Sequence, residues 1–207
     1  RQGASHDYGV IRGAWTDTMG TGMMYALGDR IKNPVFIEGL PGIGNVGKVA
    51  VDFLIDELKA KKLYEITSYT FPHSVFVNED NLVELPIVEV FYKQFSGKHD
   101  LLLLGGDVQP IDEVSSYEFS EKVLDIVEKF HGKEVITLGG IGLADIPKKP
   151  KVYCTGNSKK MIARYKNGLV SNSLYGVVGP IVGISGLLLG LASRRDIEAI
   201  SLLAETY

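Results

Sequence analysis

The sequence predicts an α/β fold, in the form of a three-layer α/β/α sandwich around a mixed, largely parallel sheet. Short apolar runs that end in glycine alternate with segments whose apolar residues recur every three or four positions, which is typical of buried strands followed by amphipathic helices. Between the first two of these units lies a stretch of alternating apolar and polar residues, typical of hairpins. We expect residues 24–207 to form this single domain.

The first unit begins after Asn33. Residues 34–38 are an apolar run between Asn-Pro and Gly-Leu-Pro-Gly, which predicts a buried strand. The apolar residues that follow share one side of a helix predicted over residues 46–60. They are Val46, Val49, Ala50, Phe53, Leu54 and Leu58.

A β-rich stretch follows, with candidate strands at 65–70, 74–78 and 83–95. Their alternation favours hairpins over crossovers. The four consecutive leucines at 101–104 then predict a strand that is covered on both faces, because such strands are apolar throughout.

The α/β alternation resumes after this strand. The pattern predicts a helix over 115–130 and a strand at 135–138 that runs into the glycine-rich segment 139–142. A short strand at 152–154 and a short helix at 159–165 follow.

Residues 169–193 carry no charge, so a membrane span has to be considered. The stretch contains Gly179-Pro180 and further glycines, and its apolar part is shorter than the ~20 residues that a span needs. We therefore predict a central helix over 180–193, with Pro180 in its first turn and glycines that allow close approach to a sheet or another subunit. The end of the chain, 203–207, is predicted to lie inside a helix.

Residues 1–23 do not follow these patterns. They contain five glycines and show neither helical nor strand periodicity, and Met23-Met24 resembles a translation start inside the chain. We expect an added or flexible extension. The alternative is an arm that becomes ordered against a partner, with Tyr8, Ile11 and Trp15 as anchors.

The charge balance and the rare residues exclude several classes of function. Lysine and arginine number 22 against 25 acidic residues, which leaves no basic footprint for nucleic acid. The four histidines lie far apart, and the single cysteine, Cys154, reads as a small core residue, so neither a metal site nor a disulfide is predicted. We expect a cytoplasmic protein that binds neither nucleic acid nor a membrane.

The strongest local motif is the glycine-rich segment 39–48. Its glycines fit the dinucleotide fingerprint and, up to its final lysine, the phosphate-loop template. Val49 stands where the phosphate loop needs a hydroxyl for magnesium, and the acid that would bind a ribose is missing. The plainer reading is a tight turn whose glycines permit positive φ and close packing. The candidates for anion binding are Gly42, Gly44, Asn45, Gly47 and Lys48.

Three glycine segments, at 39–47, 105–107 and 139–142, follow apolar strands and should share the rim at the carboxyl ends of the sheet. We find no nucleophile elbow in the sequence and no histidine near these segments, so no catalytic residue is predicted. The polar side chains expected on the rim are Asp107, Gln109, Asp112 and Glu113.

Several segments together resemble one known family. They are Gly-Leu-Pro-Gly-Ile-Gly-Asn-Val-Gly-Lys (39–48) before Val-Asp-Phe-Leu-Ile-Asp-Glu-Leu (51–58), Leu-Leu-Gly-Gly-Asp-Val-Gln-Pro (103–110), Leu-Gly-Gly-Ile-Gly (138–142), Gly-Ile-Ser-Gly-Leu-Leu-Leu-Gly (183–190) and Leu-Leu-Ala-Glu-Thr (202–206). Their order and spacing over nearly all of residues 33–206 resemble the archaeal branch of the proteasome assembly chaperone family, which is homologous to the eukaryotic proteasome assembly chaperones.

The resemblance implies an ATP-independent, homo-oligomeric chaperone without cofactor or active site, which binds proteasome core particle subunits. It also implies a C-terminal tail that ends in a hydrophobic residue, a tyrosine and any last residue. This chain departs from that pattern, because Thr206-Tyr207 places a polar residue before the tyrosine and none after it. We expect that the tail is missing here; otherwise this member docks differently. The alternative function is a small-molecule or nucleotide-binding α/β enzyme that uses loop 39–48.

Overall fold

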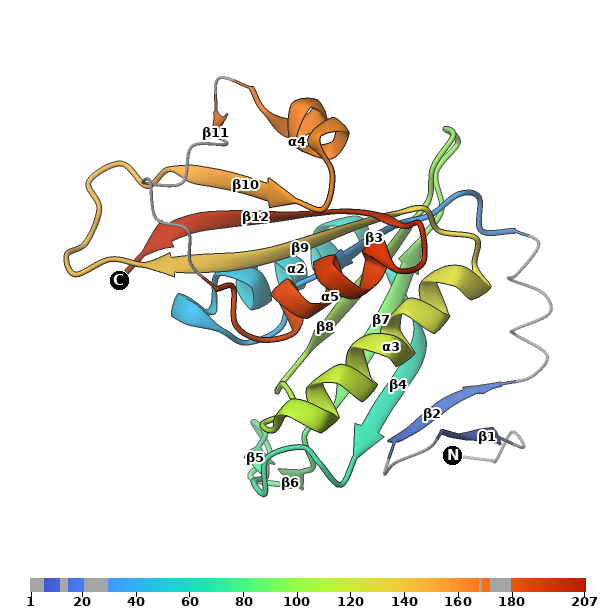
Figure 1. Ribbon diagram of the computed structural model, residues 1–207. Helices are drawn as coiled ribbons and strands as arrows, with labels where there is room; N and C mark the ends of the chain where they lie inside the picture. Colours follow the sequence, from blue (N-terminus) through green and yellow to red (C-terminus); the bar gives the residue numbers. More distant parts are fainter. Residues whose placement is uncertain (1–5, 12–14, 21–29, 168, 172–179) are drawn as a thin grey trace.

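The molecule has three layers (Figure 1). The computed structural model describes residues 6–11, 15–20, 30–167, 169–171 and 180–207. Helices α2 (Val46–Leu58) and α4 (Lys159–Tyr165) lie over one face of a mixed sheet. Helices α3 (Glu113–Lys129) and α5 (Ile184–Ser193) lie over the other. The predicted α/β/α sandwich is therefore confirmed.

The sheet has a parallel centre and antiparallel flanks. Its middle strands, which run parallel in this order, are β8 (Leu101–Gly106), β3 (Val35–Glu38), β9 (Glu134–Gly142) and β12 (Glu198–Thr206). The flanking strands are β1 (His6–Ile11), β2 (Trp15–Gly20), β4 (Lys61–Ser68), β7 (Val88–Lys93), β10 (Val152–Gly156) and β11 (Val170–Ser171). The order across the described sheet is β1-β2-β4-β7-β8-β3-β9-β12-β10-β11.

The predicted hairpins are confirmed, since β7 pairs antiparallel with both β4 and β8. Between β4 and β7 the chain forms a separate two-stranded hairpin from β5 (Phe76–Val77) and β6 (Val83–Glu84). The predicted strand 83–95 is divided into β6 and β7, because the chain turns after Glu84, and β5 is shorter than the predicted strand 74–78.

Side-chain caps explain where two of the helices begin. The Asp112 carboxylate accepts a hydrogen bond from the backbone N–H of Ser115 at 2.9 Å, at the start of α3. The Ser158 hydroxyl accepts one from the N–H of Met161 at 3.2 Å, at the start of α4. Each bond satisfies a backbone donor that the helix itself leaves unpaired. Helix α4 begins where predicted, whereas α3 begins at Glu113, before the predicted start at residue 115.

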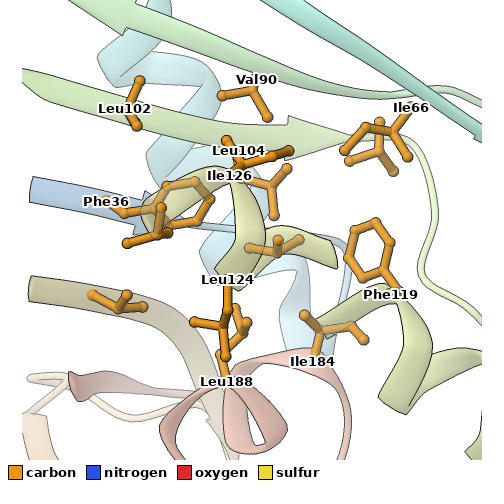
Figure 2. Close-up of a cluster of buried hydrophobic side chains, with 14 of the residues drawn as sticks. Phe36, Ile66, Val90, Leu102, Leu104, Phe119, Leu124, Ile126, Ile184 and Leu188 are labelled. Carbon is orange, nitrogen blue, oxygen red and sulfur yellow. The ribbon is translucent and has the colours of Figure 1, made fainter. Parts of the chain in front are cut away.

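The face under α3 and α5 contains the larger hydrophobic core (Figure 2). Phe36, Val90 and Leu104 from three strands are fully buried there beneath Phe119 of α3 and Leu188 of α5. Burial of each such side chain stabilises the fold by about 1.5–3 kcal/mol. Most of the apolar stabilisation therefore comes from this face.

The opposite face has a smaller core. Met161 of α4 packs with Ile136, Cys154 and Ile200 from three neighbouring strands. Cys154 is a buried free thiol, as its reading as a small core residue predicts, and burial raises the pKa of that thiol.

The prediction of a helix at the end of the chain is wrong. Residues 198–206 form β12, which pairs in register with β9 along its whole length. Asp196, with φ 55°, turns the chain between α5 and this strand. The mostly apolar run 199–204 fits a buried strand as well as a buried helix, so the sequence pattern could not separate them.

The preceding helix begins later than predicted. Pro180 lies before α5 and not in its first turn, and Gly183, with φ 95°, stands at the N-cap. The glycine spacing does not bring α5 close to the sheet, because Gly190 faces open space and Gly186 lies against the Ile181 carbonyl. Residues 172–179 of the uncharged stretch 169–193 lie outside the described residues.

No helix among the described residues combines the length and the apolar composition that crossing a membrane requires.

The N-terminal segment contains two strands that its sequence pattern does not predict. The backbones of β1 and β2 form a hairpin, and β2 pairs antiparallel with β4, with Trp15 opposite Ser68. Tyr8 and Ile11 lie in β1. Pairing with an existing sheet edge satisfies the backbone whatever the side-chain pattern, so periodicity is a poor guide here. The assignment of 1–23 as an extension of the domain 24–207 stays a prediction.

Candidate functional site

The predicted rim forms at the carboxyl ends of β8, β3 and β9, which lie side by side. Loop 39–45 leaves β3 and passes through a short 3-10 turn (Ile43–Asn45) into α2. Gly105 and Gly106, predicted as part of a loop, belong to β8. Residues 139–142 are not a loop either. They continue β9 and pair with residues 203–206 of β12, because long-range pairing extends the strand past the point where its apolar run ends.

The glycines of loop 39–45 and α2 allow backbones to touch. A Cβ on Gly39 would lie 2.1 Å from the Gly47 carbonyl oxygen, and a Cβ on Gly47 would lie 2.2 Å from the Leu138 carbonyl oxygen. Gly44 has φ 61° and lies against the Thr206 side chain. The motif thus attaches the first turn of α2 directly to the sheet.

Of the candidate anion-binding residues, Gly42, Gly44 and Asn45 lie in the exposed turn, whereas Gly47 is buried. Lys48 extends away from this turn toward β8. Its ammonium group donates to the Gly106 carbonyl at 3.1 Å and pairs with the Asp52 carboxylate at 3.0 Å. The structure therefore separates the lysine from the other candidates, since its charge is used between α2 and the sheet.

A pocket of about 410 Å³ lies beside the loop, between the loop, the end of β9 and the start of α5. Its walls are mostly apolar or glycine, and its polar side chains are Gln109 and Ser185. The Gln109 amide bridges two segments, because it donates to the Pro41 carbonyl and accepts from the Ile184 N–H. Gln109 therefore fixes the loop to the N-terminus of α5.

Glu38, at the end of β3, is fully buried beneath this pocket. Its carboxylate accepts hydrogen bonds from the Ser185 hydroxyl at 3.0 Å and from the Leu40 N–H at 3.3 Å. Desolvation outweighs these two bonds and raises the pKa of Glu38 to about 7. Sequence analysis missed this residue, although an acidic residue closing a buried apolar strand is an available signal.

Two of the carboxylates that were predicted on the rim, those of Asp107 and Asp112, accept hydrogen bonds from backbone N–H groups. Asp107 accepts the Ile87 N–H at 3.2 Å. Asp112 caps α3, and its bonds to Ser115 lower the pKa of the carboxyl group. Glu113 lies exposed in the first turn of the same helix. Of the polar residues predicted on the rim, Gln109 contacts the loop, whereas the bonds of Asp107 and Asp112 stabilise the fold.

The structure shows a second candidate binding surface, at the β5–β6 hairpin, that was not predicted from the sequence. Residues 69–86, which contain the β5–β6 hairpin, expose many apolar side chains, with Tyr69 99% exposed and Leu85 76% exposed. They also line a pocket of about 690 Å³ next to the end of β4. His73 is an exposed loop residue beside this pocket. A run without lysine or arginine from 63 to 92 was the available signal.

The comparisons with known proteins agree with this architecture. PbaB of Pyrococcus furiosus, described as an archaeal proteasome activator, is 38% identical with a TM-score of 0.80, over 86% of this chain and 76% of PbaB. PbaA of the same organism, described as an archaeal homologue of proteasome-assembly chaperone, is 27% identical with a TM-score of 0.69, over 85% of this chain and 73% of PbaA.

A Methanocaldococcus jannaschii protein described as uncharacterised is 34% identical over 176 residues, which are 85% of this chain and 67% of that protein. A match to the PAC2 family covers residues 36–207 and so includes the parallel centre of the sheet and all four described helices. The chain therefore belongs to the PAC2 family, and the resemblance to archaeal proteasome assembly chaperones is confirmed.

Proposed function

We propose that this protein is an ATP-independent, oligomeric scaffold of the cytoplasm that binds subunits of the proteasome core particle. The observation that carries the proposal is the similarity to PbaB, at 38% identity and a TM-score of 0.80, together with PbaA. Both relatives are described by a relation to the proteasome.

The distribution of apolar surface supports a binding role. The hairpin segment 69–86 and the outer side of α2, with Phe53 62% exposed, present large apolar side chains to solvent. Contiguous exposed apolar surface of this kind is typical of sites that contact other proteins. In the proposal, the protein acts through such surfaces and carries out no chemistry of its own.

Loop 39–48 has a structural role in this proposal. Lys48 is held between Gly106 and Asp52, and Gly39 and Gly47 are needed for backbone contact. A phosphate loop needs its lysine beside the bound phosphates and a hydroxyl for magnesium, and Val49 supplies none.

The position of the last residue suggests how a tail would reach a partner. Tyr207 follows β12 directly and is 72% exposed, at the same sheet edge as loop 39–45. A segment added after Tyr207 would leave the domain at this edge without disturbing the core. Several tails on one oligomer would bind together and strengthen one another through their high effective concentration.

The test is a binding titration against purified core particle and its separate α-subunits, with and without ATP. It compares three proteins. They are the 207-residue chain, the same chain with an added tail that ends in a hydrophobic residue, a tyrosine and any last residue, and the tailed chain with that tyrosine changed to alanine. We expect the tailed chain to bind at least about 10²-fold more tightly than the other two, without ATP. Binding that requires ATP, or no binding by any of the three, would refute the proposal.

A further inference from the structure

The hairpin surface, residues 69–86, combines apolar side chains with negative charge. Glu79, Asp80 and Glu84 are exposed around its tip, and the segment contains no lysine or arginine. The tip is rigidly built, since the Asn78 side chain accepts the N–H groups of Asp80 and Leu82 and donates to Glu84. The surface thus has a preformed acidic tip at 78–84, and the apolar pocket of about 690 Å³ lies at the base of the same hairpin, lined by residues 71–75, Leu85 and Pro86 among others.

The loop between β9 and β10, residues 143–151, has the complementary chemistry. Lys148, Lys149 and Lys151 are exposed, and Ile146, which precedes them, is 68% exposed. Asp145, also exposed, is the one acidic residue of the loop, so the loop has a net positive charge. The base of the loop is fixed to β12. The Leu143 N–H donates to the Thr206 carbonyl at 2.8 Å, and the Lys151 N–H donates to the Glu205 carboxylate at 3.0 Å.

Both surfaces follow the carboxyl ends of strands, but they lie on different sides of the molecule (Figure 1). The hairpin follows the carboxyl end of β4, and loop 143–151 follows the carboxyl end of β9. Strands β7, β8 and β3 lie between β4 and β9, and Figure 1 shows the hairpin and the loop projecting in different directions. The basic loop of a molecule therefore faces the hairpin of a neighbour more readily than its own.

We propose that loop 143–151 of one copy docks on the hairpin surface of the next copy. In this contact Ile146 enters the apolar pocket, and the lysines face the acidic tip of the hairpin. The inference rests on the oligomeric scaffold proposed above and names its interface. Such a contact joins two different surfaces, so repetition of it builds a ring when the rotation between copies closes. In such a ring every copy has the same orientation relative to the ring axis.

Charge reversal tests this contact directly. The hairpin variant carries Glu79→Lys and Asp80→Lys, and the loop variant carries Lys148→Glu and Lys149→Glu. In each variant alone, the docked surfaces have the same sign, so we expect the association constant to fall about tenfold or more. In a mixture of the two variants, each hairpin again meets a loop of opposite charge, and we expect assembly to recover.

The measurement is sedimentation velocity of full-length proteins at low salt, with circular dichroism to check folding. A control variant, Lys98→Glu with Lys133→Glu, changes the charge equally at the amino ends of β8 and β9 and should assemble like the parent. A further variant, Ile146→Asp, should weaken assembly and should not be rescued by mixing with the hairpin variant.

A folding defect would not be repaired by a second defective chain, so recovery in the mixture supports contact between the hairpin of one copy and the loop of another. A parent that sediments as a monomer, variants that assemble like the control, or a mixture that stays dissociated would overturn the inference. Binding to the core particle is measured separately, so a chain that assembles without binding would refute only the proposed function.

Discussion

The two faces of the central sheet hold their helices by different means. Helix α3 buries a row of large side chains, among them Phe119, Val123 and Leu124. Helix α2, on the opposite face, buries only Gly47 and Val51 and leaves much of its apolar side exposed. The first face is a conventional hydrophobic core. On the second face, α4 covers a smaller hydrophobic core. Helix α2 is joined by backbone contact and charged groups, which leaves its outer apolar surface available to other molecules.

The largest expected effect comes from truncating a core side chain under α3. Phe119→Ala removes a fully buried ring that contacts Phe71 edge-on, and we expect the free energy of unfolding to fall by about 3–5 kcal/mol. Phe53→Ala, in the exposed side of α2, should cost less than about 1 kcal/mol. Urea denaturation of both variants measures the contrast. If both variants lost the same free energy of unfolding, Phe53 would have to be as buried as Phe119, which would contradict the contrast between the two helices.

The next effect concerns Glu38, the buried carboxyl group under α5. Its pKa of about 7 in the folded protein lies above the ordinary 4.5, so between these values the folded state holds a proton that the unfolded chain has lost. The free energy of unfolding should therefore fall as pH rises through this window, by about 3 kcal/mol, and then level off.

Glu38→Gln should flatten this dependence, since the amide does not ionise. Glu57→Gln, an exposed change in α2, is the control that should retain the slope. Chemical denaturation at several pH values provides the curves. An unchanged slope in Glu38→Gln would assign the dependence to other groups.

The backbone contact between α2 and the sheet predicts a smaller loss in the free energy of unfolding. Gly47→Ala places a methyl group against the Leu138 carbonyl, and α2 has to shift, at an expected cost of about 1–3 kcal/mol. Gly190→Ala in α5 meets nothing within 4 Å and should stabilise the protein by about 0.5–1 kcal/mol through helix propensity. Opposite signs in thermal unfolding would confirm that Gly47 is required by packing.

The smallest effect is expected at Lys48. Lys48→Ala breaks a half-exposed ion pair with Asp52 and a bond to Gly106, so the free energy of unfolding should change by less than about 1 kcal/mol. Equilibrium dialysis should find no magnesium-dependent ATP binding in either the parent or the variant. Micromolar ATP binding that disappears in Lys48→Ala would reassign the loop as a nucleotide site.

Much of the fold was predictable because local signals and long-range packing agree. Helix α4 has the predicted bounds 159–165, since Ser158 caps it and Met161 is its buried side chain. Strand β3 and helix α2 follow from a buried apolar run and a regular apolar stripe. At the candidate site, the shared rim of β8, β3 and β9 also follows, because parallel strands align their carboxyl ends.

Other features depend on contacts between distant residues. The sequence by itself determined the layered α/β architecture, the family and the glycine loop. Only the tertiary structure decided that 198–206 is a strand, that Lys48 turns toward Gly106, and that Glu38 is buried beneath Ser185. The physical reason is that strand pairing, desolvation and close backbone packing depend on residues that are far away in the chain. The local periodicity of the sequence does not identify those residues.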